Sequence, residues 1–170
     1  MISREEALIA IEGALSRIAL LHVSFSKTII DELGEEKGKN LIIKSIIEYG
    51  HRMVGRVKKA LPGLTELGLY EEVGMTKEGV DYSKGCALAK VFREQDAMDV
   101  GYLYCYVDPA KAMAWDLDAK IVHLTSQACG DEDCKVEILQ TTDEEKKDFT
   151  QRARAWRKVD PRLYEYSKNH

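Results

Sequence analysis

The chain has 170 residues, of which 45% are hydrophobic and 32% charged, as in an ordinary soluble globular protein. A mass of 19.2 kDa predicts one domain, long enough to bury a core. The net charge of −4, with no block of Lys and Arg, argues against nucleic acid and anionic membrane as partners. No apolar run reaches the ~18 residues of a membrane span, and the acidic N-terminus lacks a signal-peptide pattern. We therefore expect a cytoplasmic protein.

The first third of the chain predicts two long helices in an antiparallel hairpin. Ser3 and Glu6 form a capping box. Apolar positions then recur at spacings of three and four: Leu8, Ile11, Leu15, Ile18, Phe25 and Ile29. After a break at Gly34, a second stripe follows: Ile43, Ile47, Gly50, Val54, Val57 and Leu61. We expect these stripes to form the seam, with His22 opposite Gly50 as a buried, hydrogen-bonded side chain; a ligand contact is the alternative for His22.

The middle of the chain predicts shorter elements. Residues 62–85 form a glycine-rich connector with one or two short strands, the clearest around Val80 and Tyr82. Ala87–Glu94 is helix-prone, and Asp108 followed by proline predicts a helix that has Asp108 as its N-cap.

The last third predicts a β-hairpin, Ile121–Ala128 joined to Lys135–Leu139 by a four-residue loop. This loop length places Cys129 opposite Cys134, and in the same register Gln127 pairs with Val136. A capping box at Thr142 then opens an amphipathic helix that is expected to run through Trp156.

These elements predict an α+β fold, in which an N-terminal antiparallel helical hairpin packs on a small antiparallel β-sheet with additional short helices. Residues 1–160 would form the single domain, and residues 161–170 a loose C-terminal tail. The first helix, about 43 Å long, is longer than a core of this size needs, so we also expect a homodimer.

Four cysteines lie in the second half of the chain: Cys86, Cys105, Cys129 and Cys134. No CxxC pair occurs, so a zinc ribbon or a thioredoxin site lacks its main signal. Cys86 is the strongest nucleophile candidate, because a helix N-terminus and the nearby Lys84 lower the pKa of a thiol. Cys129 and Cys134 are open to three interpretations: two buried hydrophobes, a redox-sensitive pair or one wall of a ligand pocket.

Other polar and aromatic residues are candidates for a pocket. Asp108 could orient a water or bind a substrate cation, besides its role as a cap. Several aromatic side chains could wall a small-molecule site or fill the core: Tyr102, Tyr104, Tyr106 and Trp115. The acidic loop from Gly130 to Asp133 does not match an EF-hand and predicts a solvated turn. His123 lies about 20 Å along the strand from Cys129, so we do not expect it to activate a hairpin thiol unless a bulge bends the strand.

Three motifs in order carry a family resemblance: Lys84-Gly85-Cys86-Ala87, Val100 through Cys105 to Asp108, and Gly130-Asp131-Glu132-Asp133-Cys134. Together with Leu33 to Gly38 and Tyr49-Gly50 they resemble the L-2-amino-thiazoline-4-carboxylic acid hydrolase-like family over roughly residues 20–140. Two positions depart from the family pattern. Ala87 stands where an aromatic residue or proline is frequent, and Lys135-Val136 follow the last motif in place of Asp-Phe.

The resemblance implies a hydrolase that opens a small cyclic amidine, a thiazoline carboxylate, by cleaving a C–N bond. It implies these catalytic residues: Cys86, Cys105, Asp108 and Cys134. It implies these substrate-binding residues: Lys84, Tyr104, Gly130 and Asp131. Cys129 lies outside the matched motifs. The alternative is a non-catalytic, sensor-like domain that binds a small molecule or a metal in a cysteine-lined pocket, and the sequence identifies no particular metal or cofactor.

Overall fold

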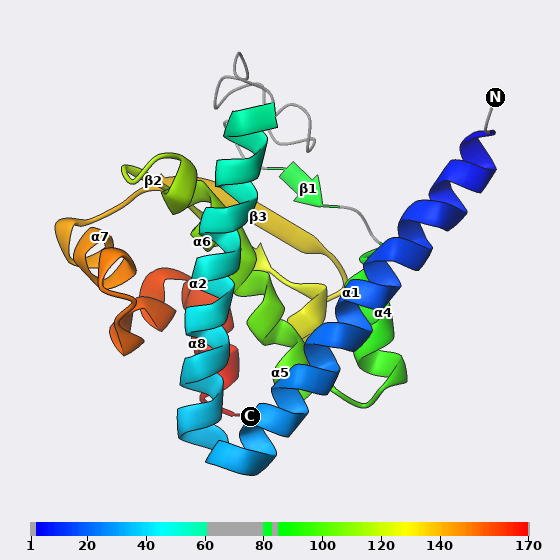
Figure 1. Ribbon diagram of the computed structural model, residues 1–170, viewed down its shortest axis with the longest axis horizontal. Coiled ribbons are helices and arrows are strands. Elements are labelled where there is room, and N and C mark those ends of the chain that lie inside the picture. Colours follow the sequence, from blue (N-terminus) through cyan, green and yellow to red (C-terminus); the bar gives the residue numbers. More distant parts are fainter. Residues whose placement is uncertain (1–2, 61–79, 83–84, 170) are drawn as a thin grey trace.

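The computed structural model describes residues 3–60, 80–82 and 85–169, and it has an α+β fold (Figure 1). The longer helices and their bounds are α1 Arg4–Leu33, α2 Glu35–Ala60, α4 Ala87–Glu94, α6 Val107–Trp115, α7 Asp143–Thr150 and α8 Pro161–Ser167. Short helical turns are α5 Met98–Gly101, η1 Tyr102–Tyr106, η2 Gln127–Cys129 and η3 Arg154–Val159. The strands are β1 Val80–Tyr82, β2 Ala119–Thr125 and β3 Cys134–Gln140.

The α1–α2 hairpin forms as the sequence predicts. Ser3 Oγ accepts a hydrogen bond from the Glu6 amide, and the Glu6 carboxylate accepts one from the Ser3 amide. The break falls at Gly34, whose φ of +76° strains any residue with a Cβ, and its amide donates to the Ile30 carbonyl. Helix α2 therefore starts at Glu35 and returns along α1 (Figure 1).

The buried face of α1 differs from the predicted stripe. The buried side chains of α1 are Ala19, His22, Val23 and Ser26. Three members of the predicted stripe are more than half exposed: Leu8, Ile11 and Phe25. Helix α1 carries apolar residues on several sides, so their spacing alone did not identify the side that packs on the body. On α2 the prediction is confirmed, since its buried residues include Ile43, Ile47 and Val54.

His22 is buried and hydrogen-bonded, as predicted, but not opposite Gly50. Its Nε2 lies 3.0 Å from the Val100 carbonyl oxygen, and burial lowers the pKa of the imidazole. The neutral ring therefore donates to that carbonyl. Gly50 faces α6 instead, where a Cβ would lie 2.9 Å from the Ala110 side chain, so the glycine permits the close contact of α2 with α6.

Helix α1 also meets the length and composition criteria for a helix that crosses a membrane, and it is the one such helix among the described residues. The longest contiguous apolar run did not reveal this property, because Glu12 and Arg17 interrupt the apolar part of the helix.

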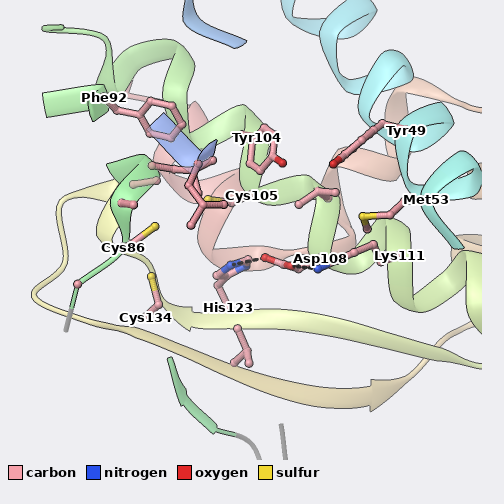
Figure 2. A pocket seen from close by; sticks show the side chains of 17 residues that line it. Tyr49, Met53, Cys86, Phe92, Tyr104, Cys105, Asp108, Lys111, His123 and Cys134 are labelled. Atoms are coloured by element: carbon pink, nitrogen blue, oxygen red, sulfur yellow. Dashed lines mark ion pairs between the residues drawn. The ribbon is translucent and has the colours of Figure 1, made fainter. Parts of the chain in front are cut away.

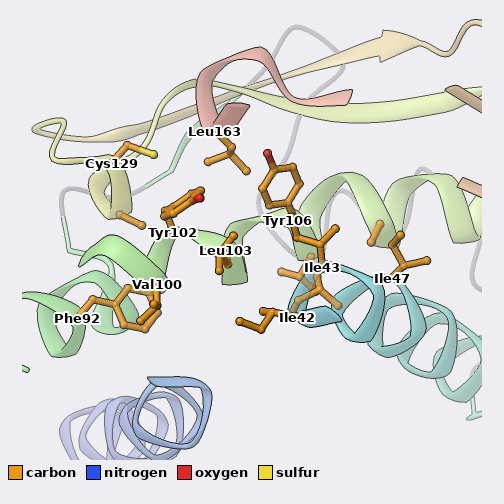
Figure 3. Close-up of a cluster of buried hydrophobic side chains, with 14 of the residues drawn as sticks. Ile42, Ile43, Ile47, Phe92, Val100, Tyr102, Leu103, Tyr106, Cys129 and Leu163 are labelled. Carbon is orange, nitrogen blue, oxygen red and sulfur yellow. The ribbon is translucent and has the colours of Figure 1, made fainter. Parts of the chain in front are cut away.

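The core lies between the hairpin and the sheet, where α2 contacts α6 and α6 contacts β2. The winding of η1 turns Tyr102, Leu103 and Tyr106 into this core (Figure 3), where each is almost fully buried. The Tyr106 hydroxyl donates to the Arg157 carbonyl at 2.9 Å, which satisfies its one buried polar atom. The adjacent Tyr104 and Cys105 are only half-buried and line a cavity instead.

The sheet is antiparallel with strand order β1-β3-β2, but the predicted register of its hairpin is wrong. Val136 pairs with His123, not with Gln127, and a bulge separates His123 from Thr125. The chain leaves β2 at Thr125 and enters the η2 turn, so Cys129 does not lie opposite Cys134. Asp131 closes this turn, because its Oδ2 accepts from the Ser126 amide at 2.7 Å.

The C-terminal segment is a packed helix, so the prediction of a loose tail is wrong. Pro161 opens α8, and Asp160 caps it by accepting from the Leu163 amide. The Leu163 side chain is fully buried, and Arg162 makes two hydrogen bonds of 2.8 Å with the Asp131 carboxylate. The helix predicted through Trp156 instead ends at Thr150, and Trp156 is buried from the η3 turn.

The burial of Leu163 predicts that α8 is part of the cooperative unit. Leu163→Ala should lower the free energy of unfolding by about 2–5 kcal/mol, because it leaves a cavity in the core. The matched control is Leu139→Ala on β3, where the side chain is 39% exposed and the loss should stay below about 1 kcal/mol. Urea unfolding followed by circular dichroism measures both; equal, small losses would mean that the segment is a loose tail.

Candidate functional site

The described residues enclose a cavity of about 380 Å³ where the hairpin, the middle helices and the sheet meet (Figure 2). Its apolar wall comes from five elements: Leu15 of α1, Met53 of α2, Leu88 and Phe92 of α4, Val107 of α6 and Val136 of β3. Its polar and sulfur-bearing lining is Tyr49, Cys86, Tyr104, Cys105, Asp108, Lys111, His123 and Cys134. The four residues predicted as catalytic thus converge on one cavity.

Three thiols lie around one side of this cavity, and two of them are held by Gln127. Cys86 has an extended backbone and is the N-cap of α4, and its amide donates to Gln127 Oε1 at 2.8 Å. The Gln127 amide in turn donates to Cys134 Sγ at 3.2 Å. Ser126 Oγ lies 3.9 Å from Cys105 Sγ. The η2 turn therefore fixes the thiol side of the cavity.

A chain of charged groups crosses the floor of the cavity. The His123 ring donates through Nδ1 to Asp160 Oδ2 at 2.7 Å, and the His123 amide donates to the same oxygen at 2.9 Å. On the other side, Nε2 lies 3.5 Å from Asp108 Oδ2, and Asp108 Oδ1 lies 2.8 Å from Lys111 Nζ. Figure 2 shows Asp108 between His123 and Lys111, away from Cys86 and Cys134.

The two aspartates hold His123 in its protonated form. Burial by itself lowers the pKa of His123, but hydrogen bonds and charge from Asp108 and Asp160 outweigh burial and raise that pKa to about 9. Burial also acts to raise the pKa of Asp108, yet Lys111 and His123 together hold it well below its usual range. At neutral pH the cavity therefore faces an imidazolium, a carboxylate and an ammonium.

Two of the thiols, those of Cys105 and Cys134, lie in surroundings that favour their uncharged form. Burial raises the pKa of Cys105 well above its usual value, and the negative charge of Asp108 adds to this effect. Burial also raises the pKa of Cys134 despite the hydrogen bond from the Gln127 amide. Both thiols are therefore neutral at physiological pH, which makes them weak nucleophiles.

Asp108 does not cap the helix that follows it, contrary to the prediction. Helical backbone already runs through η1, so α6 begins at Val107 after Tyr106 and Asp108 stands inside its first turn. From there the carboxylate points to Lys111 three residues on and to His123 on β2. Pro109 predicted a helix start two residues after the observed one, and it could not reveal the preceding 3₁₀ turn.

Two described residues that were predicted for the site, Gly130 and Asp131, do not line the cavity. Asp131 is engaged by Arg162 and the Ser126 amide, so it holds the η2 turn, and Gly130 ends that turn with a φ of +88°. Cys129 is buried in the core, as expected from its place outside the matched motifs. Lys84 lies outside the described residues.

Sequence reasoning missed His123, Lys111 and Asp160 as members of the site. His123 pairs with Val136, and both side chains face the cavity, but no sequence signal placed the carboxylates of Asp108 and Asp160 beside the His123 ring. Asp160 is 37 residues away, and Lys111 was recognisable only as the i+3 neighbour of Asp108.

Among residues 3–60, 80–82 and 85–169, no cluster of three or more His, Cys, Asp or Glu side chains could hold a metal ion. Searches of known protein families, curated proteins and solved structures find no match to this chain.

The raised pKa of His123 predicts a stability that declines in mild alkali. Unfolded His123 releases its proton near pH 6.5, whereas the folded protein keeps it up to about pH 9. This contribution is therefore complete below about pH 6.5 and is lost as the pH rises to about 9, a fall of about 3 kcal/mol in the free energy of unfolding.

The test is a series of urea unfolding curves from pH 6 to 9.5. His123→Gln, which stays neutral, should flatten the decline, while the matched change His51→Gln on the exposed side of α2 should retain it. An identical pH slope in wild type and His123→Gln would contradict a protonated His123.

Proposed function

We propose that this cavity binds a small molecule that has an apolar body and a polar end with both a hydrogen-bond donor and an acceptor. The observation that carries the proposal is the cavity's asymmetry, with apolar and sulfur-bearing walls around one charged chain of His123, Asp108 and Lys111. Ligand sites typically combine a mostly apolar lining with a few placed polar groups in about 300–1,000 Å³.

The charged chain supports a ligand with a zwitterionic or amide-like end. Lys111 and the His123 imidazolium are donors, and the ionised Asp108 between them is an acceptor. A ligand carboxylate can approach Lys111 while its amino or amidine group bonds Asp108. An aminothiazoline carboxylate, the substrate class implied by the family resemblance, has both groups on one small ring.

The neutral Cys105 and Cys134 thiols favour ligand binding over nucleophilic catalysis by these two residues. A nucleophilic cysteine is normally accompanied by a base or by positive charge that lowers its pKa. Here burial raises the pKa of Cys105 and of Cys134, and for Cys105 the charge of Asp108 opposes ionisation further. These side chains then serve as polarisable, weakly polar walls.

Hydrolysis of a cyclic amidine carboxylate is the second candidate, and His123 is the observation in its favour. A protonated imidazole facing a cavity can donate a proton to a leaving nitrogen while a water attacks the ring carbon. Asp108, with its lowered pKa, would orient that water and would be a weak base.

A larger side chain that fills the cavity should weaken ligand binding without unfolding the protein. Met53 lines the cavity from α2, whereas Val57 lies one turn further on the same helix, is also partly exposed and does not line it. Met53→Trp should weaken binding of 2-aminothiazoline-4-carboxylate at least tenfold in calorimetry, and Val57→Trp should leave it unchanged. Equal affinities in the two variants, or no heat in wild type, would refute this ligand in this cavity.

Thiol alkylation separates the two candidates. At pH 7.5 Cys105 and Cys134 should react with iodoacetamide at least tenfold more slowly than free cysteine, because both are protonated. Peptide mass spectrometry over time gives the rate at each residue. Faster alkylation than free cysteine, with turnover of the thiazoline and loss of that turnover in His123→Gln, would favour the hydrolase.

A further inference from the structure

We propose that a second copy of this chain docks on the α1–α2 face, and that each copy lays the first half of its α1 in the groove between α1 and α2 of the other. The inference rests on the apolar surface of the hairpin, independently of what the ligand cavity binds.

Apolar exposure among the described residues is concentrated on α1. Thirteen large hydrophobic side chains are exposed among the described residues. Eight of them belong to α1: Leu8, Ile9, Ile11, Ile18, Leu20, Leu21, Phe25 and Leu33. Leu41 and Tyr49 add two more from α2. By helical spacing Ile11, Ile18 and Phe25 share one side of α1, whereas Ile9 and Leu20 lie on the other side. Single exposed apolar residues are ordinary, but several on one side of a helix mark an interaction surface.

The groove between the two helices is an apolar channel of about 420 Å³. Its main apolar lining comes from both helices: Ile18, Leu21, Phe25, Ile29, Ile42 and Ile46. From Ile18 to Ile29 the channel follows α1 for about 17 Å. Tyr49 and Tyr104 line the channel on the side that it shares with the ligand cavity.

The first half of α1 has little contact with its own body. The buried residues of this helix begin at Ala19, and in Figure 1 the preceding turns extend past α4. Leu15 reaches the ligand cavity, and an exposed ion pair of 3.0 Å joins Glu12 to Lys90. The apolar stretch from Leu8 to Ile18 measures about 15 Å, close to the length of the groove.

Charge also favours a second copy as the occupant. Residues 4–17 carry three glutamates and two arginines, whereas α2 carries seven basic and three acidic residues. In the dimer, the acidic first half of α1 from one copy therefore lies beside the basic helix α2 of the other copy. Each copy supplies one α1 segment and one groove. A two-fold axis therefore lets each segment lie in the groove of the other copy, and the assembly closes as a dimer.

A bilayer is a poorer occupant of the same surface. A membrane span needs about 20 residues, and every 20-residue stretch of α1 contains Arg17, His22 and Val23. His22 is hydrogen-bonded to the Val100 carbonyl, and Val23 is buried. Insertion would remove both from the core, whereas docking of a second copy leaves them in place.

Light scattering with size-exclusion chromatography at about 100 µM tests the proposal. The wild-type protein should have a light-scattering mass of twice 19.2 kDa, the mass of a dimer. Ile11→Glu in the projecting half and Phe25→Glu in the groove should each raise the dimer dissociation constant at least about tenfold. The matched control is Leu124→Glu on β2, because Leu124 is 56% exposed, as Ile11 is, and lies away from the hairpin. Circular dichroism establishes that each variant is folded.

Three results would overturn the proposal. The first is a wild-type monomer. The second is a dimer that both hairpin variants leave intact, which would place the interface elsewhere. The third is a monomer that co-sediments with vesicles of phosphatidylcholine and phosphatidylglycerol and loses this binding in Phe25→Glu, which would assign the face to a lipid surface.

Discussion

The buried carboxylate of Asp160 is the group on which the sheet, the last helix and the candidate site all depend. One of its oxygens caps α8, and the other accepts from the backbone and the ring of His123 on β2. A buried carboxylate is stable only if its charge is compensated. Protonation of His123 supplies that compensation, and Asp108 and Lys111 extend the alternation of charge to the cavity surface.

The ligand cavity and the hairpin groove share a wall. Tyr49 and Tyr104 line both, and their rings lie 6.4 Å apart. The winding of η1 explains how one short segment serves both, because it turns Tyr102 and Tyr106 into the core and leaves Tyr104 and Cys105 to the cavity. The neutral Cys105 and Cys134 thiols then give that cavity a soft, weakly polar side opposite its charged floor.

Most of the fold could be predicted from interactions between residues that are close together in the sequence. Capping boxes at Ser3 and Thr142 and the glycine break at Gly34 are determined by near neighbours, and all three are present in the structure. The errors involve distant partners. The buried side of α1 depends on what His22 can bond in the core, and α8 depends on Asp160 finding a partner on β2. The thiols and Asp108 were found by motif, but the role of His123 depends on Asp160, which lies 37 residues further along the chain.

The central claim is that His123 is an imidazolium held between two carboxylates, and ¹⁵N NMR of its ring tests this claim most directly. The account predicts that both ring nitrogens are protonated at pH 7.5 and that the signal titrates near pH 9. It also predicts that Asp108→Asn lowers this midpoint, since the variant removes one of the two charges. A neutral ring at pH 7.5, with a midpoint at or below the ordinary 6.5, would contradict the account.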